Sequence, residues 1–125
     1  MTAHASGRMS DTRARRLVGA ERARIEAALR DLEGQVRDEG DAQDEQAGDT
    51  SGLGSDVAAE GVAMTLADGL RTRLRAADRA AARIEAGTYG RSIDSGELLP
   101  VARLEAAPLA ERTVEEQAAI EKGTG

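Results

Sequence analysis

The residues whose types and spacing come nearest to a chemical site lie in the stretch GTYGRSIDSGELLP, residues 87–100. Glycines that permit tight turns flank short polar pairs, which is typical of a small knuckle built around a metal ion. The chain contains no cysteine, however, and its single histidine, His4, lies far from this stretch. The sequence therefore offers the frame of a metal site without thiolate or imidazole ligands, and it excludes disulfides.

The rest of the chain shows no arrangement typical of an enzyme. We find no nucleophile paired with a base, and no glycine-rich phosphate loop between a strand and a helix. We therefore expect a protein that is not an enzyme and that binds no cofactor.

The composition favours an elongated helical protein of one small domain. The 125 residues are 40% hydrophobic, but much of that share is alanine, and there is no Phe, no Trp and a single Tyr. A narrow seam of Leu, Ile, Val and Ala along helices therefore fits better than a globular aromatic core. No run approaches the ~18 apolar residues of a membrane span, and the opening MTAHASGRMS lacks a signal peptide's hydrophobic region. We expect a cytoplasmic protein without membrane contact, with residues 1–10 as a disordered tail and Met1 or Met9 as the translation start.

A first helix is predicted from residue 11 to about residue 38. Its apolar residues recur at spacings of 7, 4, 3 and 4, which is the seam of a coiled coil: Val18, Ile25, Leu29, Leu32 and Val36. Ser10 or Asp11 is the expected N-cap, and the helix is expected to fade near Gly34 and Gly40.

A second helix is predicted from about residue 55 to residue 86. Its seam has spacings of 3 or 4 and comprises Ala63, Leu66, Leu70, Leu74, Ala77, Ala81 and Ile84. Ser55 or Asp56 is the expected cap at its start, and Gly87 is placed as a C-terminal glycine. Since neither helix can bury its apolar stripe alone, the two are expected to pair as a long antiparallel coiled-coil hairpin over residues 11–86.

The segment between these helices, residues 39–54, is predicted to be an acidic tip. Residues 38–60 hold eight acidic residues and no Lys or Arg, although the whole chain carries a net charge of only −6. The flanking segments are rich in arginine, so that the charge pattern is basic, acidic, basic. The alternative is that this charge run only keeps a loop solvated. The negative net charge argues against a general nucleic-acid binder.

The last part of the chain, residues 87–125, is predicted to hold the knuckle and a short C-terminal helix. Turns are expected at Tyr89–Gly90 and Ser95–Gly96. The helix is expected to run from about Pro108 or Ala110 to Glu121, with three apolar residues facing inward, namely Val114, Ala118 and Ile120.

Residues 81–117 resemble the C-terminal signature of the DksA/TraR family. In that family a helix ending in a RIE-x-GTYG phrase runs into a zinc finger with four cysteines. The matching residues here are Arg83-Ile84-Glu85, Gly87-Thr88-Tyr89-Gly90, Gly96, Pro100, Arg103-Leu104-Glu105-Ala106, Pro108 and Gln117. The resemblance implies a mainly α protein with a coiled-coil hairpin, a small zinc-finger-like knuckle and a short C-terminal helix.

The same resemblance places the family's four cysteines on Ser92, Ser95, Thr113 and Glu116. These residues are poor ligands for structural zinc, which prefers thiolate and imidazole in a closed tetrahedron. We therefore expect a metal-free knuckle in which Ser92 and Ser95 form hydrogen-bonded turns. Packing should then replace the metal, through Tyr89, Ile93, Leu98, Leu99, Val101, Leu104, Leu109 and Val114.

The resemblance also implies a function. Members of the family bind RNA polymerase directly, without DNA, by inserting the hairpin into its secondary channel, often together with the nucleotide ppGpp. Acidic residues at the tip approach the catalytic centre. The tip candidates here are Asp41, Asp44, Glu45, Asp49 and Asp56, although the family's Asp-x-x-Asp-x-Ala tip motif is matched only in part.

Three arginines are candidates for contact with polymerase: Arg83, Arg91 and Arg103. The alternative is that they pair within the molecule, with Glu85, Glu97 or Glu105. For the whole protein, the alternatives to a polymerase regulator are a structural coiled-coil protein that forms a bundle or dimer, and a passive competitor of active family members.

Overall fold

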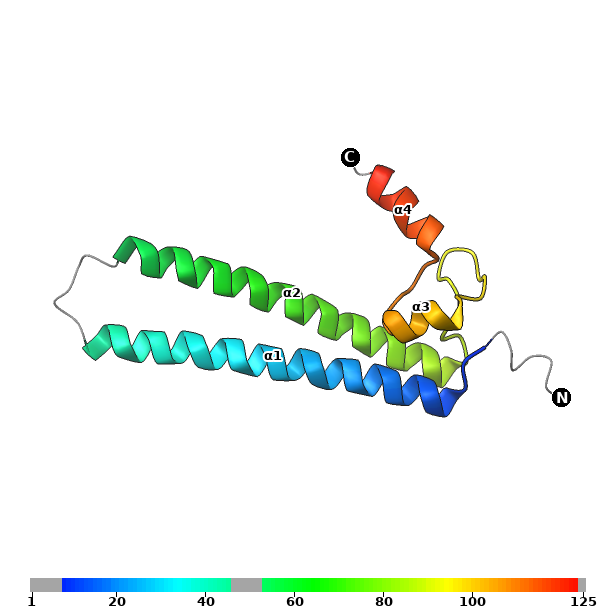
Figure 1. The fold of residues 1–125 in the computed structure, drawn as a ribbon, viewed down its shortest axis with the longest axis horizontal. Helices are drawn as coiled ribbons and strands as arrows, with labels where there is room; N and C mark the ends of the chain where they lie inside the picture. The colour runs from blue at the N-terminus through cyan, green and yellow to red at the C-terminus, as the bar shows by residue number, and fades with distance from the viewer. Residues whose placement is uncertain (1–7, 46–52, 124–125) are drawn as a thin grey trace. The chain divides into compact units, whose positions relative to one another are not determined.

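The computed structural model describes residues 8–45 and 53–123, with side chains for residues 8–35 and 58–123. Within these residues the helices are α1 (Asp11–Glu45), α2 (Leu53–Ala86), α3 (Val101–Ala106) and α4 (Val114–Gly123) (Figure 1). The described residues contain no strand, and a single antiparallel bridge joins Arg91 to Leu98. The predicted fold class, a mainly α helical hairpin with a knuckle and a short C-terminal helix, is confirmed.

The start of α1 follows the expected capping chemistry. The Ser10 hydroxyl accepts a hydrogen bond from the Arg13 backbone N–H at 3.2 Å, so Ser10 is the N-cap. The helix continues through Gly34 and Gly40 to Glu45, beyond the predicted end near Asp38. Each glycine costs a helix only about 1 kcal/mol relative to alanine, which is too little to end it. Residues 39–45 therefore belong to a helix and not to a loop.

The start of α2 differs from the prediction, whereas its end agrees with it. The helix begins at Leu53, so the predicted caps Ser55 and Asp56 are wrong and lie inside its first turn. Its end at Gly87 is confirmed, because Gly87 has a positive φ of 77°. The Gly87 N–H donates to the Ile84 carbonyl at 3.1 Å and the Thr88 N–H to the Arg83 carbonyl at 2.8 Å, which is a Schellman motif.

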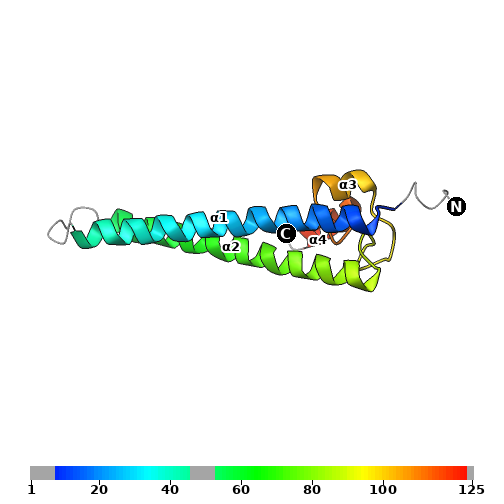
Figure 2. The ribbon, with the colours of Figure 1, turned by 90° about the horizontal axis from the view of Figure 1, so that it is seen from below.

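The chain divides into two compact units. Unit 1 comprises the chain up to Glu21 and from Ala76 onward, and unit 2 comprises residues 22–75. In each unit a segment of α1 lies antiparallel to a segment of α2, as Figures 1 and 2 both show. None of the helices in the described ranges 8–45 and 53–123 is both long enough and apolar enough to span a bilayer.

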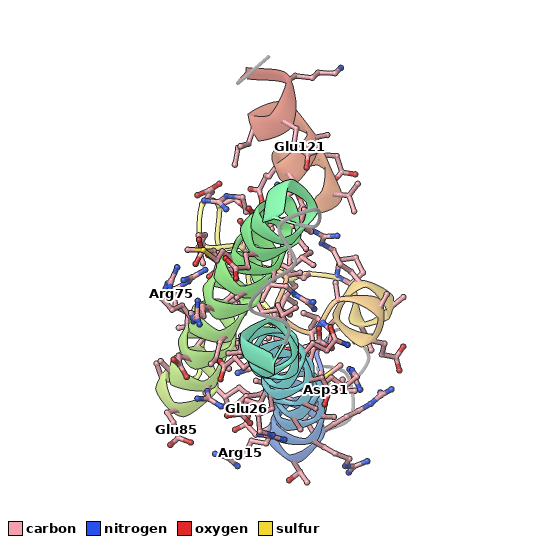
Figure 3. The ribbon with its side chains drawn as sticks, turned by 90° about the vertical axis from the view of Figure 1, so that its left-hand side faces the viewer. Arg15, Glu26, Asp31, Arg75, Glu85 and Glu121 are labelled. Atoms are coloured by element: carbon pink, nitrogen blue, oxygen red, sulfur yellow. The ribbon has the colours of Figure 1, made fainter. Side chains whose placement is uncertain are left out.

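Unit 2 holds its helices together with a sparse seam. Among its described side chains, Ile25 and Ala67 are buried. The predicted seam residue Leu66 is 55% exposed, because the spacing Ala63, Ala67, Leu70, Leu74 places the neighbouring alanine at the helix interface. Charged side chains such as Glu26, Asp31 and Arg75 project from the helices (Figure 3). An exposed ion pair between Arg71 and Glu33, at 3.7 Å, links the two helices.

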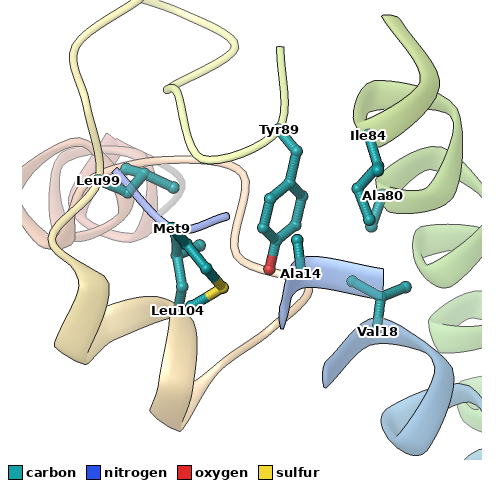
Figure 4. Close-up of a cluster of buried hydrophobic side chains, with 8 residues drawn as sticks. All are labelled: Met9, Ala14, Val18, Ala80, Ile84, Tyr89, Leu99 and Leu104. Carbon is teal, nitrogen blue, oxygen red and sulfur yellow. The ribbon is translucent and has the colours of Figure 1, made fainter. Parts of the chain in front are cut away.

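Unit 1 contains the main hydrophobic core. The cluster joins α1 and the segment before it, α2, residues 87–100 and α3 through Met9, Ala14, Val18, Ala80, Ile84, Tyr89, Leu99 and Leu104 (Figure 4). In the part of α2 that belongs to unit 1 the buried alanines are Ala77 and Ala80, and the predicted Ala81 is exposed. An ion pair between Arg15 and Glu85, both labelled in Figure 3, lies at the surface of this unit.

The segment just before α1 corrects the prediction of a disordered tail over residues 1–10 for residues 8–10, while residues 1–7 lie outside the described part of the chain. Met9 is only 7% exposed and packs beside Leu99 and Leu104 (Figure 4). The Arg8 guanidinium donates to the Gly87 carbonyl at 3.1 Å. Methionine is flexible and fills irregular gaps, which suits a core that has one aromatic residue. Residues 8–10 are therefore part of the folded unit.

Candidate functional site

The knuckle, residues 87–113 between α2 and α4, is shaped by three glycines. Gly87, Gly90 and Gly96 all have positive φ, a conformation that side chains disfavour. From Gly90 to Leu99 the chain folds back on itself through two backbone hydrogen bonds. The Ser92 N–H donates to the Glu97 carbonyl at 2.8 Å, and the Leu99 N–H to the Gly90 carbonyl at 2.7 Å.

The serine at the first family ligand position is buried, and all of its hydrogen-bonding capacity is used. Ser92 is 4% exposed. Its hydroxyl donates to Oε1 of Glu116 at 2.6 Å and accepts from the backbone N–H groups of Asp94 and Ser95, both at 3.1 Å. A hydroxyl has one proton to donate and two lone pairs that accept. The Ser92 hydroxyl therefore has no proton and no lone pair left for another partner. The turn that was predicted around Ser92 and Ser95 is therefore present.

Two of the three remaining positions, Thr113 and Glu116, form a capping box at the start of α4. The Thr113 hydroxyl accepts from the Glu116 N–H at 3.1 Å, while Oε1 of Glu116 accepts from the Thr113 N–H at 2.8 Å. The helix consequently begins at Val114, and the predicted start at Pro108 or Ala110 is wrong. Ser95 is exposed and accepts a hydrogen bond from the Glu97 N–H at 3.3 Å.

Hydrogen bonding lowers the pKa of Glu116 from 4.5 to about 2. The first cause is the bond from the Ser92 hydroxyl, followed by the Thr113 backbone N–H and the Ser95 side chain. The charged form of Glu116 is therefore the one that the knuckle binds.

Structural zinc, which the family's finger implies, does not fit these residues. It needs four N or S donors, mostly thiolate, whereas this set offers three hydroxyls and one carboxylate. Ser92 and Thr113 are already engaged by backbone N–H groups. Among the described side chains, no three His, Cys, Asp or Glu residues gather where they could hold a metal ion.

The packing that was expected to replace a metal is only partly present. Tyr89, Leu99 and Leu104 are buried, with Val101 and Leu109 packed against them. Ile93, Leu98 and Val114 were expected inside but are 49%, 42% and 58% exposed. On α4, Ala118 and Ile120 are exposed too, and the helix has no buried residue. The prediction that this helix packs inward is therefore wrong.

A second polar cluster ties α2 to the segment before α4. Glu111 accepts hydrogen bonds from Nε of Arg79 at 2.9 Å and from Nη1 of Arg83 at 2.9 Å. The pKa of Glu111 is lowered, chiefly by the bond from Arg79. Tyr89 is anchored nearby, since its hydroxyl donates to the Pro108 carbonyl at 2.8 Å, and burial raises its pKa.

The three candidate contact arginines all bond within the molecule, but not to the predicted carboxylates. Arg83 bonds to Glu111 and its side chain is only 14% exposed. Arg91 is exposed and donates to the Gly96 carbonyl at 2.9 Å. Arg103 is partly buried and donates to the Arg112 carbonyl at 2.8 Å.

The acidic tip candidates lie away from this cluster in the sequence. Asp41, Asp44 and Glu45 fall in the last turns of α1, and Asp56 falls in the first turn of α2. Their side chains, and Asp49 as a whole, lie outside the described residues.

Three features of the site were not predicted. The capping box was visible in the sequence as TVEE, residues 113–116, which has the form Thr-x-x-Glu. Glu111 carried no comparable signal, because its partners lie 28 and 32 residues away. The pair of Arg112 with Asp94, at 2.7 Å, likewise depends on how the chain folds back.

The pKa of Glu116 predicts how the knuckle responds to acid. Because the folded-state pKa is depressed, its stabilising contribution is present above the ordinary value of 4.5 and is lost as the pH falls toward about 2. We expect the free energy of unfolding of unit 1, measured by denaturant titration with the near-UV circular dichroism of Tyr89 as the signal, to be constant above about pH 5 and to fall below it. Glu111 acts in the same direction, so Glu116→Gln should remove only part of this acid dependence. A Glu116→Gln profile identical to that of the unmodified protein would contradict the assignment.

Comparison with known proteins bears on the fold. The structure of transcription factor DksA2 from Pseudomonas aeruginosa is similar, with a TM-score of 0.77 and 24% sequence identity, over 91% of this chain and 84% of that one. RNA polymerase binding protein and transcriptional regulator Dks from Chlamydia trachomatis L2 (LGV434) shares 28% identity over 84% of this chain and 92% of that one, at a TM-score of 0.40. No protein-family model and no curated protein matches the chain. The likeness to DksA2 in both extent and topology means that this chain has the DksA-like fold that residues 81–117 predict.

Proposed function

We propose that this protein is a transcription regulator that binds RNA polymerase directly through the hairpin of α1 and α2. The observation that carries the proposal is the fold shared with transcription factor DksA2 over 91% of the chain. In this proposal the hairpin enters the secondary channel of the polymerase, and the connection between the helices approaches its catalytic centre. The protein would then act in the cytoplasm, without contacting DNA and without catalysis of its own.

The charge of the hairpin connection supports this orientation. Residues 38–60 carry eight acidic residues and no Lys or Arg. Carboxylates near a polymerase magnesium centre would perturb it electrostatically. Asp41, Asp44, Glu45, Asp49 and Asp56 remain the residues proposed for this role, with ppGpp as an effector to be tested alongside the polymerase.

The exposure of the three candidate arginines indicates which of them could contact polymerase. Arg83 is a poor candidate, because it is largely buried and bonded to Glu111. Arg91 is exposed on the knuckle, and its bond to a backbone carbonyl leaves part of the guanidinium accessible. Arg91 is therefore the arginine that we propose to test first.

A polymerase capture experiment tests this function. Immobilised protein is expected to retain purified RNA polymerase, and Asp41→Asn/Asp44→Asn should retain it equally while losing most of the effect on initiation in vitro. The matched control is Glu97→Gln/Glu115→Gln, which removes two exposed acids elsewhere and should leave both properties unchanged. Failure of the unmodified protein to bind polymerase would exclude this function and that of a passive competitor together. Binding without any effect on initiation would favour the competitor.

One observation favours a second candidate, an interaction protein that associates through its helices. On α2, Val62, Met64 and Leu66 are 59%, 68% and 55% exposed. Leu66 also lines a shallow groove of about 540 Å³, together with apolar side chains such as Leu32 and Leu70 and with the charged side chains of Asp31 and Arg73. A concentration-dependent oligomer in sedimentation experiments, together with indifference to the Asp41→Asn/Asp44→Asn change, would support this alternative.

A further inference from the structure

The Glu116 carboxylate lies where the start of α4 meets the turn at Ser92. It is the first-turn glutamate of α4, it accepts from the Thr113 N–H, and it accepts from the Ser92 hydroxyl across 24 residues of sequence. One oxygen atom, Oε1, receives both bonds, at 2.6 and 2.8 Å. We propose that Glu116 is the cross-link that fixes the Ser92 turn to the start of α4, in place of the metal ion that the fold family implies.

The bond from Ser92 separates this role from ordinary helix capping. A capping box needs only Thr113 and Glu116, and those two bonds are both present. The additional bond from Ser92 is short, as charge-assisted O–H···O⁻ bonds are. Its donor is buried and is itself held by the Asp94 and Ser95 N–H groups. The carboxylate therefore joins the Ser92 turn to α4, which helix capping does not require.

The neighbouring contacts show that these two segments run side by side. The Ile93 N–H donates to the Glu111 carbonyl at 2.9 Å, and Arg112 pairs with Asp94 at 2.7 Å. Neither contact involves Glu116, so we expect both to persist without it. Loss of the cross-link should therefore loosen the Ser92 turn without unfolding the core around Leu104.

The positions that a metal would bridge are thus already bridged by one anion. Ser92 and Ser95 are separated by two residues, as are Thr113 and Glu116, which is the ligand spacing of a zinc knuckle. Here each pair instead forms a hydrogen-bonded turn, and the carboxylate connects them. An added cation would have to displace several of these bonds.

Hydrogen exchange measured on the full chain tests this cross-link, whether or not the protein binds polymerase. In Glu116→Ala, exchange at the Asp94, Ser95 and Thr113 amides is expected to become at least about tenfold faster, because each depends on the cluster. The Leu99 amide, bonded to the Gly90 carbonyl, should be unchanged. The matched control is Glu115→Ala, an exposed first-turn glutamate of the same helix, which should change none of these amides. Faster exchange confined to Thr113 and α4 would mean that Glu116 only caps the helix, and would overturn the proposal.

A second variant keeps the test valid if Glu116→Ala does not fold. Ser92→Ala removes the bond between segments but keeps the capping box intact. Under the proposal the Thr113 amide then exchanges severalfold faster, because the Glu116 carboxylate that accepts its hydrogen bond is no longer held in place by the Ser92 hydroxyl. An unchanged Thr113 amide in Ser92→Ala would contradict the cross-link.

The metal arm of the experiment uses zinc chloride and a chelator. Exchange in the knuckle is expected to be the same with equimolar zinc, with excess chelator, and with neither. Elemental analysis of the purified protein should find no stoichiometric zinc. Stoichiometric zinc, or slower exchange at Asp94 and Ser95 on adding it, would show that a metal holds the knuckle and would overturn the proposal.

Discussion

Replacing Leu104 with alanine is expected to lower the free energy of unfolding of unit 1 by about 2–5 kcal/mol, the usual range for a buried leucine. Leu104 is 1% exposed and packs in the cluster with Met9, Tyr89 and Leu99. Its Cδ1 atom also comes within 3.4 Å of where a Cβ on Gly90 would lie. Because the chain has a single aromatic residue, few large side chains can move into the cavity.

Denaturant unfolding followed by the near-UV circular dichroism of Tyr89 would measure this loss. Tyr89 is the chain's one aromatic residue and belongs to the same cluster, so it reports on unit 1 directly. Leu98→Ala serves as the matched control, because Leu98 is also in the knuckle but is 42% exposed. We expect that control to cost less than about 1 kcal/mol. Equal losses for the two variants would show that the core is not centred on Leu104.

The second large effect is expected at Glu111. In Glu111→Ala, Arg83 would keep a largely buried guanidinium with no carboxylate beside it. Among the described residues, Nε and Nη2 of Arg83 already lack hydrogen-bond partners, and Nη1 is bonded to Glu111. Breaking a fully buried pair costs about 3–5 kcal/mol. Since Glu111 and Arg83 are 16% and 14% exposed, we expect about 2–3 kcal/mol after discounting for solvent screening.

Arg79→Ala is the matched control for that change. Arg79 bonds to the same carboxylate, but its side chain is 53% exposed, so its loss is expected to cost less than about 1 kcal/mol. Replacing Arg83 by methionine together with Glu111→Ala should recover part of the loss, because no unpaired charge then remains buried. Thermal unfolding of the four proteins would measure these differences. A larger loss for Arg79→Ala than for Glu111→Ala would rule out the burial argument.

Helical periodicity made much of the fold predictable. Seam positions such as Ile25, Ala77 and Ile84 are buried as their spacing indicates, and Gly87 ends α2 through its positive φ. The sequence could not decide whether Leu66 or Ala67 lies at the helix interface, because both residues are apolar and they are adjacent in the sequence. The end of α1 was predicted too early, because Gly34 and Gly40 were expected to end the helix, whereas α1 continues through both to Glu45.

The local features of the candidate site could be predicted from the sequence, whereas its long-range contacts could not. The capping box of Thr113 and Glu116 is local and could have been read from its spacing, which would also have placed the start of α4. The bonds of Glu111 to Arg79 and Arg83, and the burial of Met9, arise only once distant segments meet. Pairing from sequence proximity favoured Glu85 for Arg83, but residues two apart on a helix do not face each other.

The sparse seam of unit 2 has a consequence for how the protein fluctuates. Among its described side chains only Ile25 and Ala67 are buried, while most helix stability in proteins comes from packing of an apolar face. Its backbone hydrogen bonds should therefore open in small, frequent excursions, with free energies well below that of global unfolding. Unit 2 would then be the part of the chain that adjusts its shape at the least energetic cost, while the cluster around Leu104 stays closed.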